Sequence, residues 1–228
     1  MTRDDMVTSA LLLYNEPSTS AAIATADWQA FNTSIYQEVC RDCRAYPDNE
    51  VQATANAQRT YMIPVAFAGI RDGGVYHATA GQLKGPLTME ELSLEVTLWR
   101  ASTGTPTHWY FADEVVTVST STNWAIGLHP VPTAVANLTL SGWSVPAALS
   151  ASAIPSIPTG HHDTIVWGMC YRAAVRDMDR TGRNAPKLTM FRDEYLGRKQ
   201  ALLQNMIDFG MEGWPLAPPH TLKAEGAR

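Results

Sequence analysis

The stretch IPTGHHDTIVWGMCYRAAVRD, residues 157–177, decides how the last part of the chain folds. It opens with the polar residues His161, His162 and Asp163, and apolar residues then follow at helical spacing. An acid in the first turn of a helix is stabilised by the positive end of the helix dipole. The apolar residues are Ile165, Val166 and Met169. The pattern predicts a helix over about 161–180.

A second long helix is predicted after the break at residues 181–184, which read TGRN. Pro186 suits the first turn, because its missing N–H group would have no helical partner there. Gly210 is a natural stop. We therefore expect a helix over 186–209. Its apolar stripe is Leu188, Phe191, Tyr195, Leu202, Met206 and Phe209.

The beginning of the chain also predicts helices. A short apolar face from Met6 to Leu13 predicts the first, which ends at Asn15-Glu16-Pro17. Thr25 or Asp27 is expected to cap the second by accepting hydrogen bonds from free N–H groups. The stripe of the second helix is Trp28, Phe31, Ile35 and Val39.

The middle of the chain changes to a strand pattern. Residues 58–64, QRTYMIP, predict a strand, and Asp72-Gly73-Gly74 predicts a tight turn into a returning strand. Thr88 and Glu91 form a capping box that predicts a short helix. Between residues 108 and 146, short β-branched and aromatic runs alternate with turn residues, as in half-buried strands.

These elements define an α+β fold in which terminal helices form a helical bundle around an inserted, mostly antiparallel β domain. The expected domains are residues 1–48 with 157–209 for the bundle, 49–156 for the β-rich insertion, and 210–228 for an extended C-terminal tail.

Composition limits the classes of function. The chain has 228 residues and a net charge of −5, which argues against a broad nucleic-acid-binding face. From Ala101 to Gly160, Asp113 and Glu114 are the charged residues, whereas 17 of these 60 residues are Ser or Thr. Such a surface is equally compatible with an ordinary β domain and with one covered by neighbouring subunits. No segment approaches the roughly 20 apolar residues of a membrane span, and we expect no signal peptide.

The two adjacent histidines raise the possibility of a metal or catalytic site. Neighbouring residues on a helix point about 100° apart, so His161 and His162 do not easily share one metal ion. Helical metal pairs use i, i+4 spacing, and the residue four after His161 is Ile165. We therefore interpret His161, His162 and Asp163 as a helix start and predict no catalytic, metal or cofactor-binding residues.

Three other patterns have structural explanations. Cys40 and Cys43 form a C-x-x-C pair late in a helix, without a second pair to complete a zinc site, so we interpret them as small packed residues. Glu90-Glu91 and Asp113-Glu114 read as a helix cap and a turn. The seven tryptophans are expected at core and interface positions. They are Trp28, Trp99, Trp109, Trp124, Trp143, Trp167 and Trp214.

The order of several phrases resembles the head–tail adaptor (connector) proteins of tailed bacteriophages. The phrases are ADWQAFNTSIYQEVCRDC, RTYMIPVAFAGIRDGGVY, PLTMEEL, PTHWY, LHPVP, ANLTLSGWSVP, the stretch at 157–177, and FRDEYLGRKQALLQNM. The resemblance covers about Met6 to Phe209. The weakly charged, Ser/Thr-rich β region departs from the family pattern.

The resemblance implies a non-enzymatic virion protein without cofactors, made in the host cytoplasm. Copies would form a ring, usually of twelve, beneath the portal protein and would contact a tail tube or nozzle protein. Genomic DNA would pass through the channel without sequence-specific binding. We expect helices 161–180 and 186–209 to form the ring wall and the tail at 210–228 to order on docking to the portal.

Two other functions remain open from the sequence. One is a carbohydrate- or host-binding tail module that uses the β region, and the other is a metal-dependent hydrolase that uses His161 and His162. A stopper or tail-completion protein is a close variant of the adaptor interpretation.

Overall fold

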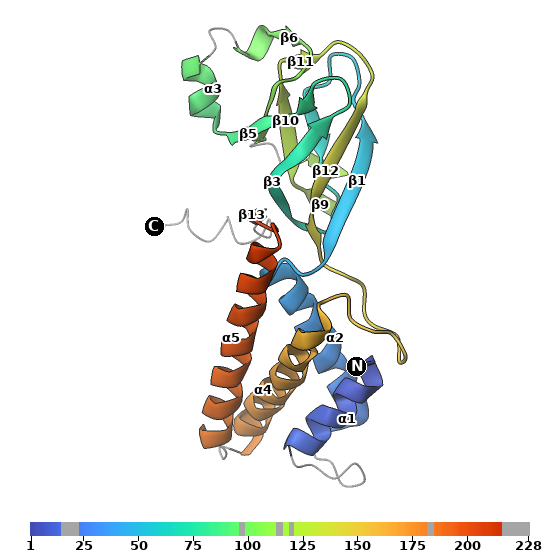
Figure 1. The fold of residues 1–228 in the computed structure, drawn as a ribbon, viewed down its shortest axis with the longest axis vertical. Coiled ribbons are helices and arrows are strands. Elements are labelled where there is room, and N and C mark those ends of the chain that lie inside the picture. The colour runs from blue at the N-terminus through green and yellow to red at the C-terminus, as the bar shows by residue number, and fades with distance from the viewer. Residues whose placement is uncertain (15–22, 96–98, 113–115, 119–120, 182–184, 216–228) are drawn as a thin grey trace. The chain divides into compact units, whose positions relative to one another are not determined.

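The computed structural model describes residues 1–14, 23–95, 99–112, 116–118, 121–181 and 185–215. The chain divides into two compact units, which we call the helical unit and the β unit (Figure 1). The helical unit is Met1–Tyr46 with Val145–Gly210, and the β unit is Pro47–Ser144 with Met211–Arg228. Helices and mostly antiparallel strands together confirm the predicted α+β class.

The helical unit is built from four α-helices. They are α1 (Arg3–Tyr14), α2 (Thr25–Asp42), α4 (His162–Thr181) and α5 (Ala185–Asp208), and a 3-10 turn, η2 (Thr159–His161), leads into α4. Helix α4 packs against each of the other three, and α1 also packs against α2. The predicted helices are confirmed with ends that differ by only a few residues.

A glycine allows three of these helices to approach closely. A Cβ atom added at Gly168 on α4 would lie 2.6 Å from Cγ2 of Ile35 and 2.9 Å from Cε2 of Tyr195. Ile35 belongs to α2 and Tyr195 to α5, and both side chains are buried. The core between α2, α4 and α5 therefore uses the space that a larger residue at position 168 would fill.

Two details of the helix predictions are wrong. The N-cap of α2 is Ala24, and Asp27 lies in the first turn, where its carboxylate accepts a hydrogen bond from the Ala24 N–H group at 3.3 Å. Neither Thr25 nor Asp27 is therefore the cap residue. Phe209, predicted in the apolar stripe of α5, is 73% exposed because the helix ends at Asp208.

The β unit contains two main sheets. One has the order β1-β12-β3-β13, with β4 also paired to β3, and the other has the order β2-β10-β7-β5. The strands of the first are β1 (Pro47–Ala53), β3 (Phe67–His77), β4 (Gly81–Gln82), β12 (Asn137–Ser144) and β13 (Gly213–Pro215). Those of the second are β2 (Thr60–Met62), β5 (Lys84–Leu87), β7 (His108–Phe111) and β10 (Ala125–His129).

Four short strands and two short helices complete the β unit. Strand β6 (Thr103–Gly104) pairs in parallel with β11 (Val131–Pro132), and β8 (Val116–Val118) pairs antiparallel with β9 (Ser121–Asn123). The helices are α3 (Met89–Glu95) and the 3-10 turn η1 (Trp99–Ala101).

One apolar core joins the two main sheets. The first sheet contributes Ile70, Val75, Leu138 and Leu140 to this core, and the second sheet contributes Trp109. The alternation predicted from the sequence is confirmed at β12, where Leu138 and Leu140 are fully buried and Thr139 between them is not. The other contributors are Tyr61, Ile63, Phe67, Leu83, Ile126 and Leu128.

The turn predicted at Asp72-Gly73-Gly74 is wrong, because β3 continues through these residues. Ile70 pairs with Gly142 and Val75 with Leu140, so residues 71–74 lie opposite Ser141 alone. This arrangement is a β-bulge, which bends the strand without reversing it. Gly73 has φ +63°, and a Cβ atom at Gly74 would lie 2.3 Å from the Ser141 carbonyl oxygen. The glycine pair therefore serves a bulge.

The chain returns to the β unit after α5. Strand β13 pairs antiparallel with β3, and Met211 just before it is buried. Residues 211–215 of the segment predicted as a C-terminal tail thus include a strand of the sheet, and residues 216–228 lie outside the described part of the chain.

Candidate functional site

The histidine pair at the start of α4 contributes to the fold. His162 is buried, and its Nε2–H group donates to the Ile157 carbonyl oxygen at 3.2 Å. Burial lowers the pKa of His162, so the neutral ring is favoured. Asp163 is exposed and lies 3.8 Å from the Arg198 guanidinium. The predicted helix start is confirmed, and in the described part of the chain no three His, Cys, Asp or Glu side chains are grouped to hold a metal ion.

The C-x-x-C pair at the end of α2 is buried in the helical unit. Cys40, Cys43 and Cys170 are all buried and none is in a disulfide. Burial raises the pKa of each thiol to about 12. A thiol with such a pKa is almost entirely protonated near neutral pH and is a poor nucleophile. The interpretation as packed residues is confirmed by their burial.

Of the two predicted acid pairs, Glu90-Glu91 lies at the start of α3. Glu91 accepts hydrogen bonds from the N–H group and the hydroxyl of Thr88, at 2.6 and 2.9 Å, so the capping box of α3 is confirmed. Asp113 and Glu114 lie outside the described residues.

Six of the seven tryptophan side chains are described, and four of these are buried in the two units. The four are Trp28, Trp99, Trp109 and Trp143.

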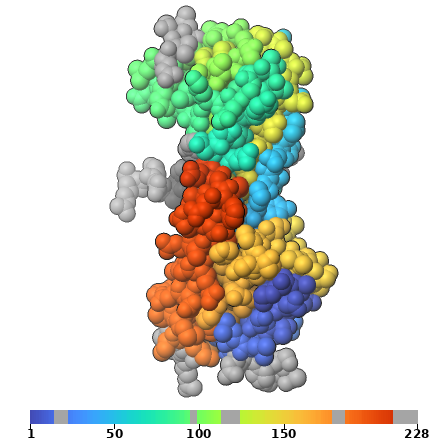
Figure 2. All heavy atoms as spheres, in the orientation of Figure 1, coloured from blue at the N-terminus to red at the C-terminus, as the bar shows by residue number. Residues whose placement is uncertain are grey.

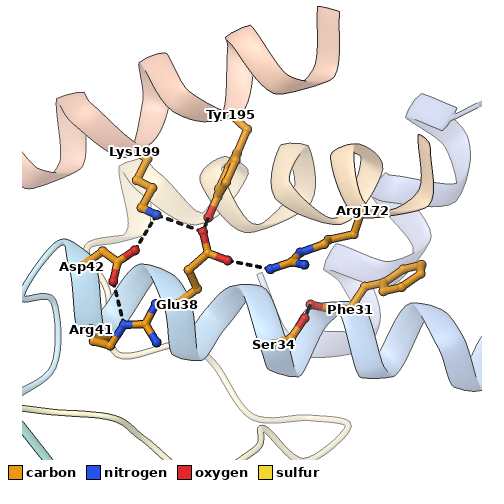
Figure 3. A network of polar contacts seen from close by, with 8 residues as sticks. All are labelled: Phe31, Ser34, Glu38, Arg41, Asp42, Arg172, Tyr195 and Lys199. Atoms are coloured by element: carbon orange, nitrogen blue, oxygen red, sulfur yellow. Dashed lines mark hydrogen bonds and ion pairs between the residues drawn. The ribbon is translucent and has the colours of Figure 1, made fainter. Parts of the chain in front are cut away.

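A polar network that the sequence did not reveal ties α2 to α4 and α5 (Figure 3). Its centre is Glu38, whose Oε1 accepts hydrogen bonds from the Tyr195 hydroxyl at 2.8 Å and from Lys199 Nζ at 2.9 Å. Its Oε2 accepts from Arg172 at 2.9 Å. Lys199 also contacts Asp42 at 2.7 Å. One carboxylate thus joins side chains from three helices.

The protonation states in this network follow from burial and charge together. Burial by itself would raise the pKa of Glu38, but the hydrogen bonds from Lys199 and Tyr195 more than offset it, so the pKa lies below its usual value. Asp42 shows the same balance, with Arg41 and Lys199 as its partners. Both carboxyls therefore stay ionised and hold the helices together.

The outer surface of the helical unit carries apolar side chains. Leu196 on α5 is 51% exposed, and Met190 on the same helix is about half exposed. On the C-terminal side of Leu196 the exposed residues Gly197, Gln200, Ala201 and Gln204 are uncharged, whereas Arg192, Asp193 and Glu194 on its N-terminal side are exposed and charged. On α1, Leu12 is also exposed. Figure 2 shows α5 as a continuous part of the surface of this unit. An uncharged patch with charged residues at its border is suited to contact with other chains.

The β unit contains a pocket of about 230 Å³ beside η1. Trp99 is buried in its wall, and the guanidinium carbons of Arg59 and Arg100 each lie 5.3 Å from the centre of the Trp99 ring. Arg59 also donates a hydrogen bond to the Arg100 carbonyl oxygen. The remaining lining residues are Thr60, Met89, Tyr110 and Ala112. We call this site the arginine pocket.

Sequence reasoning missed both polar sites for the same reason. Glu38 and Asp42 show i, i+4 spacing, as do Tyr195 and Lys199, and these two pairs were a detectable signal. The signal did not reveal that α2 and α5 lie near each other. In the arginine pocket, Arg59 is far in sequence from Trp99 and Arg100, so no local pattern joins them.

The described residues thus present exposed apolar side chains on α1 and α5 and an arginine-lined pocket, and both are suited to contact with other chains. Comparison with protein families shows that the SU10 adaptor protein family matches the chain over residues 1–208. The chain belongs to this family. It is a structural phage protein and a component of the virion.

Two further findings complete the comparison. No curated protein matches the chain. None of the helices in the described ranges has the combination of length and apolar character needed to cross a bilayer.

Proposed function

We propose that this protein is a head–tail adaptor whose copies assemble into a ring of twelve beneath the portal protein. The ring joins the portal to a tail tube or nozzle protein. The observation that carries the proposal is the family match, which spans helices of the helical unit and nearly the whole β unit. The uncharged patch of α5 from Leu196 to Gln204 supports it, because identical copies need surfaces that can be buried against each other.

Helices α4 and α5 form the wall of the proposed ring. Three helices pack against α4, and the Glu38 network fixes α5 to α2, so the wall is rigid before assembly. The outer residues of α5 are then free to contact the next copy. We also propose that the helical unit and the β unit act as separate domains, with different partners for each.

Genomic DNA passes through the proposed ring without sequence-specific binding. A wall rich in Lys and Arg would hold the phosphate backbone, so the channel surface is acidic or neutral. Helices α4 and α5 together contain seven basic and six acidic residues, so the wall that they form is close to neutral. A strongly basic channel in an assembled ring would contradict it.

The segment after β13 binds the portal in this proposal. The test is a truncation that removes residues 216–228 and keeps β13 and Met211, because these belong to the sheet and its core. We expect the truncated protein to fold and to form rings but to lose portal binding in a pull-down assay. Portal binding at full strength would contradict this part of the proposal.

Native mass spectrometry of the purified protein, alone and mixed with portal, tests the main proposal. We expect a ring of twelve copies in at least one of these conditions. The test variant is Leu196→Glu, which places a charge in the uncharged patch of α5, and its matched control is Glu194→Gln in the charged part of the same helix. The first variant should impair ring formation and the second should not. A wild-type protein that stays monomeric at every concentration, with and without portal, would refute the ring.

A further inference from the structure

The arginine pocket concentrates positive charge in an acidic unit. Residues 47–144 contain four bases and eight acids. Two of the four bases, Arg59 and Arg100, lie against the same Trp99 ring, while the other two, Arg71 and Lys84, are exposed elsewhere in the unit. Half of the positive charge of this segment thus lines one small pocket.

The two guanidinium groups have no acidic partner among the described residues. The interactions that the structure records for them are the contacts with Trp99 and the hydrogen bond from Arg59 to the Arg100 carbonyl group. Two like charges beside a buried aromatic ring repel each other, and the low-dielectric wall strengthens that repulsion. A carboxylate between them would remove the repulsion and accept charge-assisted hydrogen bonds from both groups.

The size of the pocket indicates what kind of carboxylate enters. A volume of about 230 Å³ is below the range of roughly 300–1,000 Å³ that is typical of small-molecule sites. It is enough for one side chain. The excess of acids in the surrounding unit repels a polyanion such as DNA, so a single Asp or Glu side chain of a protein is favoured over a phosphate backbone.

The acidic residues of the β unit supply such a side chain. Glu91 is engaged in the capping box, and Asp48 accepts a hydrogen bond from Ser144 at 2.6 Å. The Glu50 side chain is exposed and makes no hydrogen bond or ion pair with the described residues, and the adjacent Val51 is 57% exposed. Both lie on β1, at the end of its sheet. An exposed edge strand is a frequent docking element.

The positions of β1 and α3 fit a contact that repeats from copy to copy. Met89 of α3 lines the pocket, and Figure 1 shows α3 and β1 on opposite sides of the β unit. A ring is built from heterologous contacts, in which one surface of each copy meets a different surface of the next. The arginine pocket on one side of the β unit and the Glu50 side chain on the other side meet this requirement.

We propose that the Glu50 carboxylate of one copy binds in the arginine pocket of the neighbouring copy. This inference rests on the ring proposed above and names a contact that holds the β units together within it.

A charge-reversal cycle tests the contact. Arg100 is the residue to change, because it is exposed, whereas Arg59 also supports η1 through its hydrogen bond. We expect Arg100→Glu and Glu50→Arg each to weaken self-association about tenfold, measured by sedimentation velocity over a range of concentrations. The double variant, with both changes in one chain, should recover most of the loss, because the reversed charges again attract each other.

Matched controls carry the same charge changes outside the contact. Arg71→Glu and Asp72→Arg alter exposed residues of β3 and should leave self-association within about twofold of wild type. Far-UV circular dichroism and thermal unfolding of each variant verify that it folds. Additive losses in the double variant, or a loss with Asp72→Arg equal to that with Glu50→Arg, would overturn the proposal.

Two other measurements separate this inference from its alternatives. If Arg100→Glu lowers binding to the portal but not self-association, the pocket accepts an acid from another protein and the second-copy assignment is wrong. If the wild type binds a short DNA duplex and Arg100→Glu abolishes that binding, the site recognises phosphate and the proposal is overturned. A ring that forms normally from all variants would refute the contact while leaving the proposed ring intact.

Discussion

The two units of this protein use their charged residues in different ways. In the helical unit, ion pairs join Glu38 to Lys199 and to Arg172, and a further pair joins Arg176 to Asp27. In the β unit, no ion pair is found among the described residues, and Arg59 and Arg100 have no acidic partner. Charges that are paired within a chain support its fold, whereas unpaired charges around a pocket are available to another chain. The comparison therefore distinguishes residues for folding from residues for docking.

The largest expected effect tests whether the two units are energetically separate. Trp28→Ala removes a fully buried ring that contacts Tyr14 and Phe31 in the helical core. We expect a loss of about 3–5 kcal/mol in the free energy of unfolding, because a large cavity remains. Urea unfolding followed by far-UV circular dichroism measures the loss. Hydrogen exchange of the β12 amides should stay close to wild type, and an equal loss of protection there would show that both units unfold together.

Removal of the central carboxylate tests the folding role of the charges. Glu38→Ala leaves Lys199, Arg172 and the Tyr195 hydroxyl without their shared acceptor. Because Glu38 is only partly buried, we expect a loss of about 2 kcal/mol, less than for a fully buried pair. The control is Asp193→Ala, which breaks an exposed pair with Arg192 and should cost under about 0.5 kcal/mol. Chemical denaturation of both variants compares them, and equal losses would contradict the network.

The pH dependence of stability follows from the same network. Folding lowers the pKa of Glu38 below 4.5 and that of Asp42 below 3.8. A carboxyl with a depressed pKa contributes stability that is complete above its unfolded pKa and is lost as pH falls through its folded pKa. We therefore expect the helical unit to lose stability below about pH 4.5.

Glu38→Gln isolates that contribution. Its free energy of unfolding should fall less steeply than that of the wild type below pH 4.5, and the two curves should be parallel at higher pH. Acid sensitivity between about pH 6.5 and 4.5 has another source, because burial lowers the pKa of His162 in the helical unit and of His77 and His129 in the β unit. A variant whose curve is parallel to the wild type throughout would exclude a role for Glu38.

The smallest effect concerns the helix beside the arginine pocket. Thr88→Ala removes the hydroxyl that accepts from the Glu91 N–H group, so α3 loses its cap. We expect a loss of about 1 kcal/mol in the stability of this helix. Hydrogen exchange of the α3 amides measures it, and Thr88→Ser serves as the control that keeps the cap. The variant should also weaken self-association slightly, since Met89 lines the pocket. Unchanged exchange in α3 would contradict the prediction.

Elements with a clear local pattern could be predicted from the sequence. The stripe of α2, the start of α4 and the capping box of α3 depend on residues within a few positions of each other, and the structure has all three. No nearby residue distinguishes the bulge at Gly73-Gly74 from the expected turn, because the bulge depends on Ser141, which lies on a strand far along the chain. The Glu38 network and the arginine pocket were missed for a related cause, since their members become neighbours only when distant elements pack.

The return of the chain to the β unit at β13 affects the order of events during synthesis. The helical core requires α5, and the part of β3 from Gly69 to Arg71 is paired with β13, which follows α5. The helical unit is therefore complete only after Gly210 has been added, and the β unit gains its last described strand only after Pro215. A nascent chain therefore cannot present both finished units to another copy until α5 and β13 have both been synthesised.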